Sequence, residues 1–236
     1  KKTEAEFKRL IDENELGAVV TIAGCIGSCY LEPIVDVIDD DGSASRYVHM
    51  TADKVEAVVN QHMIGKKPVE EYLIPEAGRA FLEKQTRIAL KNCGLINPED
   101  IDDYVAAGGY QAVRKALFEM DGDAICSEIE KSGLRGRGGG GFPTGKKWVQ
   151  VRGQAEPVKY IVCNGDEGDP GAFMDRSVME GDPHRMLEGM IIAGIATGAQ
   201  IGYIYVRAEY PLAVHRLRVA IAQAEAAGYL GENIMG

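Results

Sequence analysis

A glycine-rich segment, residues 132–148 with the sequence SGLRGRGGGGFPTGKKW, is the first candidate for chemistry. Glycine lets backbone N–H groups approach a ligand where a Cβ atom would collide. The segment also holds four basic side chains, Arg135, Arg137, Lys146 and Lys147, in a chain whose formal net charge is -10. These residue types predict a site for an anionic ligand, because backbone N–H groups and basic side chains both attract negative charge.

Three other interpretations of this segment remain open. The pattern G-x-G-x-x-G from Gly136 to Gly141 matches the dinucleotide fingerprint, but a helix rather than a strand is predicted before it. The pattern G-x-x-x-x-G-K ending at Lys146 resembles the phosphate loop of nucleotide triphosphatases, but Lys147 stands where Ser or Thr is needed. A flexible linker is the third interpretation, and the bulky Phe142 argues against it.

A polar turn follows a predicted apolar strand at residues 160–162. Its polar side chains are Asn164, Asp166, Glu167 and Asp169. Open α/β sheets bind ligands beyond the carboxyl ends of their strands, and Asn and Asp side chains suit the hydroxyl groups of a sugar or polyol. A calcium loop is an alternative, but Ser177 stands at the twelfth position, where Glu is needed. A solvated acidic turn is the other alternative.

Two cysteines, Cys25 and Cys29, form a C-x-x-x-C pair at a predicted junction of strand and loop. Two thiolates at this spacing can hold iron. An iron or zinc site needs two more ligands, however, and the chain has no second close pair of cysteines. Metal ligands and two free or buried thiols are therefore both open. Cys93, Cys126 and Cys163 are isolated, which is typical of small buried side chains.

The composition is that of an ordinary globular protein, with 236 residues, 45% hydrophobic and 26% charged. The acidic balance argues against a nucleic-acid surface, which needs clustered Lys and Arg. Five cysteines and the lack of a secretory leader fit a reducing compartment, so we expect a cytoplasmic protein. Residues 189–206 carry no charge, but a helix at 186–199 and a buried strand at 201–206 explain them better than a membrane span.

The hydrophobic periodicity predicts two parts of different character. In residues 1–65 it predicts a helix (3–14), three strands (17–22, 34–38 and 46–50) and a second helix (52–63). Further along the chain it predicts helices at 98–107, 110–120, 123–132 and 211–227. The first part is too short for a complete domain, whereas the alternation of strand and helix after residue 157 favours an α/β sheet.

Several segments together resemble the flavin subunit of NADH dehydrogenases, the group that includes the FMN-binding subunit of respiratory complex I. GLRGRGGGGFPTGKKW and YIVCNGDEGDPGAFMDRS carry the resemblance, and YIYVRAEYPLA supports it. AGCIGSCYLEPIVDV is similar to the second half of a thioredoxin-like domain that binds a two-iron, two-sulfur cluster, and RIALKNCGLINPEDIDDYVAAGGYQA to the linker behind such a domain. This fusion is typical of electron-bifurcating and NAD(P)-reducing hydrogenases.

The resemblance also implies roles for individual residues. It places FMN against Gly136, Arg137, Gly138, Gly139, Lys147, Asn164, Asp166 and Glu167. It places NAD(P)H beside Phe142 and Asp169, and the two-iron cluster on Cys25 and Cys29. The family's second flavin segment, its four-iron cysteine motif and the two earlier cysteines of the two-iron site are absent from this sequence.

The sequence therefore predicts an α/β fold in three parts. Residues 1–65 are expected to form half of a thioredoxin-like ferredoxin domain, residues 66–120 a linker with helices, and residues 121–236 an FMN-binding Rossmann-like domain that is incomplete at its C-terminus. Four-iron clusters are expected in the missing C-terminal part. We expect a piece of a longer protein, because neither end of the sequence looks like a natural terminus.

The function implied by the resemblance is hydride transfer between NAD(P)H and FMN, followed by one-electron transfer to iron–sulfur clusters of a larger complex. The expected partners are a thioredoxin-like ferredoxin subunit and an iron–sulfur or hydrogenase catalytic subunit, with no nucleic acid and no membrane span. No general acid or base is expected, because the cofactor performs the chemistry. The alternatives are a non-catalytic scaffold subunit of such a complex and a module that binds a nucleotide triphosphate.

Overall fold

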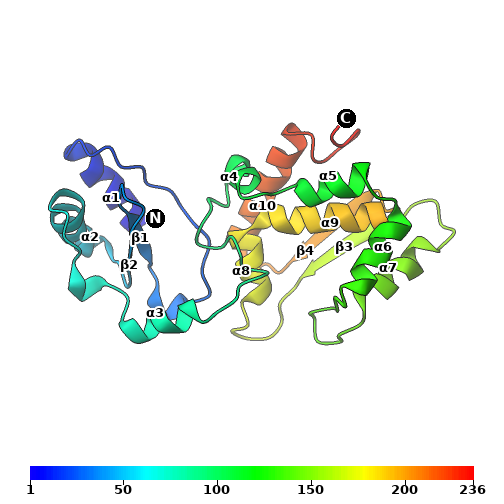
Figure 1. Cartoon of the computed structure of the whole chain (residues 1–236), viewed down its shortest axis with the longest axis horizontal. Coiled ribbons are helices and arrows are strands. Elements are labelled where there is room, and N and C mark those ends of the chain that lie inside the picture. The colour runs from blue at the N-terminus through cyan, green and yellow to red at the C-terminus, as the bar shows by residue number, and fades with distance from the viewer. The chain divides into compact units, whose positions relative to one another are not determined.

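The computed structural model describes residues 1–236 and divides into two compact units, Lys1–Lys91 and Asn92–Gly236 (Figure 1). Each unit has a hydrophobic core of its own. The predicted linker, residues 66–120, is divided between them, since its residues up to 91 belong to unit 1 and those from 92 onward to unit 2.

Unit 1 consists of short elements around one core. In chain order they are α1 (Lys2–Glu13), η1 (Cys29–Leu31), β1 (Val35–Ile38), β2 (Ala44–Tyr47), η2 (Ala52–Lys54), α2 (Val55–Val58), η3 (Val59–Ile64), η4 (Glu70–Tyr72) and α3 (Glu76–Glu83). α1 buries Phe7, Leu10 and Ile11, because residues three and four apart share one face of a helix. This face packs in the core with Val55 and Val58 of α2. β1 and β2 pair antiparallel, as the sequence predicts.

The strand predicted at residues 17–22 does not form. Val19, in its centre, is 92% exposed, and the single sheet of unit 1 contains only β1 and β2. A short apolar run becomes a strand only where a neighbouring strand completes its backbone hydrogen bonds, and this segment pairs with no strand in the structure. The two-stranded sheet does not confirm a thioredoxin-like half domain, which stays a prediction.

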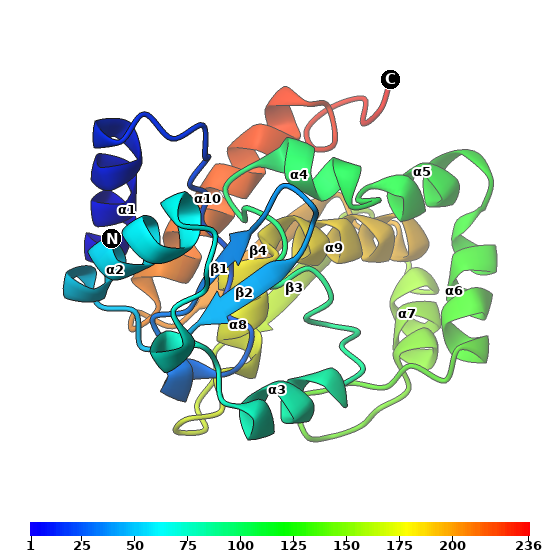
Figure 2. The ribbon, with the colours of Figure 1, turned by 60° about the vertical axis from the view of Figure 1, so that its left-hand side comes forward.

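Unit 2 is a mixed α/β unit in which helices predominate (Figure 2). In chain order its elements are α4 (Ile101–Ala106), α5 (Gln111–Phe118), α6 (Gly122–Lys131), α7 (Thr144–Arg152), β3 (Tyr160–Gly165), α8 (Met174–Gly181), α9 (Pro183–Thr197), β4 (Ile201–Val206) and α10 (Pro211–Ala226). β3 and β4 pair in parallel, with Tyr160 opposite Ile201 and Gly165 opposite Val206. α8 and α9 form the crossover between the two strands, as a parallel pair requires.

α9 is the central helix of unit 2. It packs against both strands and against α5, α6, α7 and α10. Pro183 stands in its first turn, where a missing N–H is tolerated, and Gly198 ends it with a φ of 79° in the left-handed region. No helix of the structure combines the length and the apolar character that crossing a membrane requires.

The strand predicted at residues 201–206 forms as β4, but it is not buried as expected. Tyr203 and Tyr205 are 57% and 60% exposed, and on β3 Val162 is 64% exposed. These side chains alternate with Ile161, Cys163 and Ile204, which are half-buried. A parallel sheet is normally covered on both faces. Here α9 packs on the sheet and the outward-pointing side chains remain open to solvent, which no sequence pattern within the strand reveals.

A buried carboxylate fixes the start of α5. Glu188, on α9, accepts hydrogen bonds from the N–H groups of Tyr110 at 3.0 Å, Ala112 at 3.1 Å and Val113 at 3.2 Å. The hydroxyl of Tyr104 also donates to Glu188. The first N–H groups of a helix have no partner inside that helix, so Glu188 satisfies donors that α5 leaves open.

A histidine one turn earlier on α9 joins two further elements. The hydroxyl of Tyr110 lies 2.8 Å from Nδ1 of His184, and Oε1 of Gln223 on α10 lies 3.0 Å from its Nε2. Since the amide oxygen can only accept, Nε2 carries the proton and Nδ1 accepts from the phenol, which is the neutral imidazole. Burial lowers the pKa of His184, and the amide of Gln223 opposes this shift.

Candidate functional site

The glycine segment forms an exposed loop between α6 and α7. Its base is closed by hydrogen bonds from the N–H of Gly136 to the carbonyl of Phe142 at 2.9 Å and from the N–H of Thr144 to the carbonyl of Leu134 at 2.9 Å. The guanidinium of Arg135 donates to the carbonyl of Gly141 at 3.0 Å. Residues 137–141 thus form the tip of a closed loop. We call the tip and its base together, residues 134–144, the glycine loop.

Most of the loop glycines are not required by packing. A Cβ atom built on Gly138, Gly139 or Gly140 meets no atom within 4 Å. Gly139 and Gly141 have φ values of 98° and 60°, which favour glycine because a Cβ strains the left-handed region. The N–H groups of residues 137–141 take no part in the backbone hydrogen bonds that close the loop, so they are open to a ligand. This is the property that binding of a phosphorylated group such as FMN requires, so the residues present fit that cofactor.

The basic and aromatic residues of the segment lie on the same loop and on the helix that follows it. Arg137, Lys146 and Lys147 are exposed, and Phe142 is 50% exposed. Lys147 stands in the first turn of α7, whose free N–H groups give that end a positive partial charge. The loop and the start of α7 together form a positively charged rim that suits an anion.

Gly145, directly behind the loop, has a different role. A Cβ atom there would lie 2.6 Å from the Cα and N atoms of Glu130 on α6. Two helices can approach this closely only where a glycine leaves room. Gly145 therefore packs α7 against α6 and so fixes where the loop begins and ends.

The second set of predicted residues lies at the carboxyl end of β3, where Asn164 belongs to the strand and Asp166, Glu167 and Asp169 follow in the polar turn. Asn164, Asp166 and Asp169 are exposed, and the side-chain oxygen of Asn164 accepts a hydrogen bond from the N–H of Asp166 at 3.0 Å. This turn leaves the carboxyl end of β3, and both it and the glycine loop lie on the lower side of unit 2 in Figures 1 and 2. The residues thus lie at the carboxyl end of β3, as the sequence predicts, and ligand binding there stays a prediction.

Glu167 differs from its neighbours because it is buried, with 6% of its surface exposed. Its carboxylate accepts hydrogen bonds from the N–H groups of Met174 at 2.6 Å and Asp175 at 3.1 Å, at the start of α8, and from the hydroxyl of Tyr210 at 3.1 Å. A carboxylate at a helix N-terminus is stabilised by the helix dipole. Glu167 therefore holds the polar turn to α8 in this structure, and its predicted contact with FMN stays a prediction.

Two residues that the sequence did not single out, Arg207 and Tyr210, follow β4 and contact Glu167 of the polar turn. Arg207, just after β4, donates to the backbone carbonyl of Glu167 and forms an ion pair with Glu209 at 2.9 Å. The hydrogen bond from Arg207 holds the pKa of Glu209 down at about 2. The signal was available, because Arg207 and Tyr210 follow the carboxyl end of a strand parallel to β3.

The cysteine pair of unit 1 does come together. The Sγ atoms of Cys25 and Cys29 lie 3.6 Å apart, and the N–H of Gly27 donates to Sγ of Cys25 at 3.3 Å. A carboxylate oxygen of Glu32 lies within 4.8 Å of both sulfur atoms. Burial, and then the carboxylate of Glu32, raise the pKa of Cys25 to about 12. Since a two-iron cluster takes four ligands of the cysteine or histidine type, these residues do not fit one unaided.

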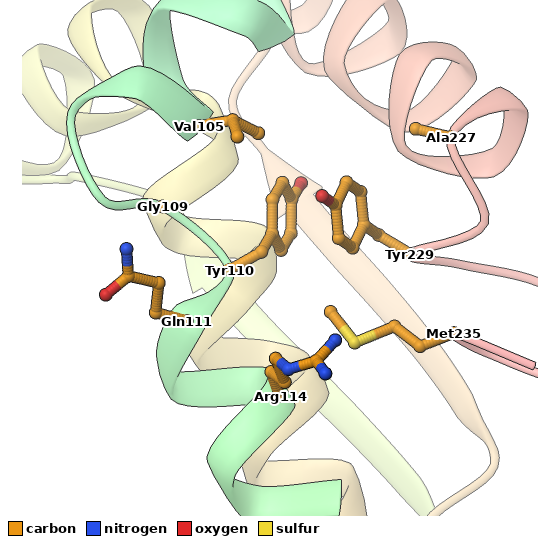
Figure 3. Close-up of a pocket in the computed structure, with 8 residues that line it drawn as sticks. All are labelled: Val105, Gly109, Tyr110, Gln111, Arg114, Ala227, Tyr229 and Met235. Atoms are coloured by element: carbon orange, nitrogen blue, oxygen red, sulfur yellow. The ribbon is translucent and has the colours of Figure 1, made fainter.

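The structure also has a cavity that none of the predicted residues lines. Its volume is about 330 Å³, and it is lined by Val105, Gly109, Tyr110, Gln111, Arg114, Ala227, Tyr229 and Met235 (Figure 3). The rings of Tyr110 and Tyr229 stack face to face with centroids 3.9 Å apart. The cavity belongs to the helical side of unit 2 and is separate from the glycine loop.

The fold and the site define a class of protein, namely a mixed α/β protein with an exposed, positively charged glycine loop and a polar turn at the carboxyl end of a parallel strand. Residues 129–235 match the family described as the Nuo51 FMN-binding domain. Both segments that carry the predicted resemblance lie in the matched range. The resemblance to the flavin subunit of NADH dehydrogenases is thereby confirmed.

Curated proteins give the same result. The NADP-reducing hydrogenase subunit HndC of Solidesulfovibrio fructosivorans is 55% identical over 154 residues, which cover 65% of this chain and 31% of that protein. An NADH-quinone oxidoreductase subunit of Rhizobium meliloti is 47% identical over 149 residues, covering 63% and 35%. The matched part spans about a third of the length of these relatives.

Among solved structures, the chain is similar to an NAD+-reducing NiFe hydrogenase in the H2-reduced state. The TM-score is 0.50 at 24% identity, and the similarity covers 97% of this chain and 38% of that chain. At this identity the similarity concerns the fold alone.

Proposed function

We propose that this chain takes part in hydride transfer between NAD(P)H and FMN within a larger oxidoreductase, with the glycine loop and the polar turn forming the flavin site. The match of residues 129–235 to an FMN-binding domain carries the proposal. The open N–H groups at Gly138, Gly139 and Gly140 support it, because nothing in the protein's own packing requires glycine there.

The proposed roles follow from the chemistry of each group. Within the glycine loop, Gly136, Arg137, Gly138 and Gly139 bind the flavin, and Lys147 reaches its ring or its phosphate. Asn164 and Asp166 accept hydrogen bonds from the hydroxyls of its ribityl chain. Phe142 and Asp169 lie beside the nicotinamide nucleotide. When bound, FMN provides the group that accepts a hydride and releases single electrons, whereas the residues of this chain bind and orient it.

Glu167 has a positioning role in this proposal. Its carboxylate, held by α8 and Tyr210, keeps the polar turn at the carboxyl edge of the sheet. Arg207 holds the backbone of the same residue from the adjacent strand. The two contacts fix the direction in which Asn164 and Asp166 leave β3, so the flavin contacts are set before the ligand arrives.

The partners follow from the relatives, which are named as subunits of a hydrogenase and of NADH-quinone oxidoreductases. We propose that this chain passes single electrons to iron–sulfur clusters on other subunits, such as a ferredoxin subunit or a hydrogenase catalytic subunit. Iron–sulfur clusters in the same protein and a cytoplasmic location belong to the same proposal.

Anaerobic visible spectroscopy of the purified protein tests this function. We expect flavin absorbance that bleaches on addition of NADH or NADPH. Gly138→Glu should weaken FMN binding by placing a carboxylate at the loop tip, whereas the matched control Gly189→Ala should not, since a Cβ at either glycine meets no protein atom within 4 Å. A protein without flavin, or a flavin indifferent to both nucleotides, contradicts the proposal and favours a non-catalytic scaffold subunit.

A further inference from the structure

The cavity on the helical side of unit 2 has no part in the proposed flavin site. Its volume of about 330 Å³ lies at the lower end of the range of about 300–1,000 Å³ that is typical of small-molecule sites. It is formed by segments distant in the sequence, namely the end of α4, the start of α5 and the residues that follow α10 (Figure 3). The fold therefore creates this cavity, and no local sequence pattern reveals it.

The charge of the cavity favours an anion. Among its lining residues Arg114 is the only charged one, and none is acidic. The guanidinium of Arg114 forms no ion pair and no hydrogen bond within the protein, and its Cζ atom lies 5.5 Å from the centroid of the Phe118 ring. Figure 3 shows this guanidinium on the side of the cavity where Met235 lies. Its N–H donors are thus available, and a carboxylate is the group that a guanidinium binds through two parallel hydrogen bonds.

The apolar walls of the cavity are fixed in place. The rings of Tyr110 and Tyr229 stack with centroids 3.9 Å apart, and the hydroxyl of Tyr110 lies 2.8 Å from Nδ1 of His184. The segment after α10 is held by its backbone, since the N–H of Met235 donates to the carbonyl of Gly228 at 2.8 Å. Aromatic and thioether surface favours an apolar ligand body. Walls that are ordered beforehand also lower the entropy cost of binding.

The backbone that brings Tyr110 to the cavity is strained. Tyr110 has a φ of 60°, in the left-handed region that a bulky side chain rarely adopts. Just before it, a Cβ atom at Gly109 would lie 2.1 Å from the ring of Tyr104, so only glycine allows the chain to pass this close to α4. Strain of this kind is concentrated at binding and active sites. The conformation of Tyr110 therefore supports a role for the cavity beyond packing.

We propose that this cavity binds a small organic monocarboxylate whose apolar body is about the size of a benzene ring. The carboxylate pairs with the guanidinium of Arg114, and the apolar body lies against Tyr229 and Met235. One guanidinium neutralises one carboxylate, which is why a single negative charge is specified. This proposal goes beyond the flavin site and is independent of it, so either can fail without the other.

Titration of the 236-residue chain with benzoate, followed by amide NMR spectra, tests the site. We expect saturable shifts at Tyr110, Arg114 and Tyr229. Benzamide has the same shape without the charge, and it should bind at least about tenfold more weakly, since a hydrogen bond to a charged group contributes about 1.5–3 kcal/mol. Bound FMN should leave the affinity for benzoate unchanged.

Three variants separate charge from shape. Arg114→Gln should bind benzoate at least about tenfold more weakly and benzamide as before. Lys115→Gln removes the neighbouring exposed cation, which does not line the cavity, and as the matched control it should bind benzoate with unchanged affinity. Ala227→Leu places a larger side chain at the cavity wall and should weaken the binding of both probes.

Several results would overturn the proposal. One is the absence of saturable benzoate binding. Another is equal affinity for benzoate and benzamide, or unchanged benzoate binding in Arg114→Gln, because either would remove the guanidinium from the site. Shifts confined to the glycine loop would place benzoate in the flavin site instead. Circular dichroism of each variant shows that unit 2 has kept its fold.

Discussion

Two regions of unit 2 use the same residue types for opposite purposes. Among the helices that pack around α9, glycine and carboxylate serve the packing of the protein itself. Gly145 of α7 lies against Glu130 of α6, and Glu188 of α9 accepts four hydrogen bonds. In the glycine loop a Cβ atom at Gly138 would meet no atom within 4 Å, and in the polar turn Asp166 is exposed. The residue type alone therefore does not show whether a glycine or an acid stabilises the fold or is free to bind a ligand. That depends on whether other residues of the protein pack against it or hydrogen-bond to it.

The comparison predicts that stability depends on the helical layer. Glu188→Ala leaves the Tyr104 hydroxyl and three N–H groups of the α5 start without an acceptor. We expect a loss of about 3–5 kcal/mol in the free energy of unfolding, since each unsatisfied buried donor costs about 1–3 kcal/mol. Urea denaturation measures it, with Glu225→Ala on the exposed face of α10 as the control. A loss no larger than that of Glu225→Ala would contradict the prediction that Glu188 stabilises the start of α5.

The two kinds of glycine give the next largest difference. In Gly145→Ala the new methyl group meets the backbone of Glu130, so we expect a loss of about 1–3 kcal/mol, as for other overpacked sites. In Gly138→Ala the methyl group meets nothing, and the free energy of unfolding should change by less than about 0.5 kcal/mol. Chemical denaturation of both variants checks this, and equal losses would show that the loop is packed after all.

The two acids of the polar turn sharpen the comparison further. Glu167→Gln weakens charge-assisted hydrogen bonds at the start of α8, and we expect a loss of about 1–2 kcal/mol in stability. Asp166→Asn, on an exposed side chain, should leave stability unchanged and weaken FMN binding instead. Thermal melts and a titration of flavin fluorescence separate the two effects. Identical behaviour of the two variants would contradict the division of roles.

The smallest effect that we expect is a pH dependence from His184. Because burial lowers its pKa in the folded protein, the unfolded chain binds a proton first as the pH falls below about 6.5. His184 thus contributes stability that is present above that pH and is lost as the pH falls toward its folded-state pKa. Asp182, whose pKa burial raises, acts in the opposite direction.

Unfolding measurements from pH 7.5 to about 5 on the protein and on His184→Gln isolate this term, since Asp182 is present in both. We expect the acid-side loss of stability to be smaller in His184→Gln. An equal pH slope in the two proteins would mean that the histidine does not titrate in this range.

The local elements were largely predictable from the sequence. The helix periodicity of residues 3–14 and 211–227 gives α1 and α10, and the hairpin and β4 form where the apolar runs predict them. The ligand-binding segments were predictable as well, because a glycine run with basic residues and a polar turn after a strand depend on local residue types. The strand predicted at residues 17–22 was wrong, because a strand needs a partner that local pattern does not provide.

The sequence by itself thus determined where the glycine loop and the polar turn lie, which family the residues 129–235 resemble, and most of the helices, though not α3, α7 or α8. Only the tertiary structure decided which side chains remain available. It buried Glu167 against α8 while leaving Asp166 exposed, and it brought Glu32 to the two thiols of unit 1. The physical reason is that local residue types set backbone preference, whereas burial and hydrogen-bond partners come from residues distant in the chain.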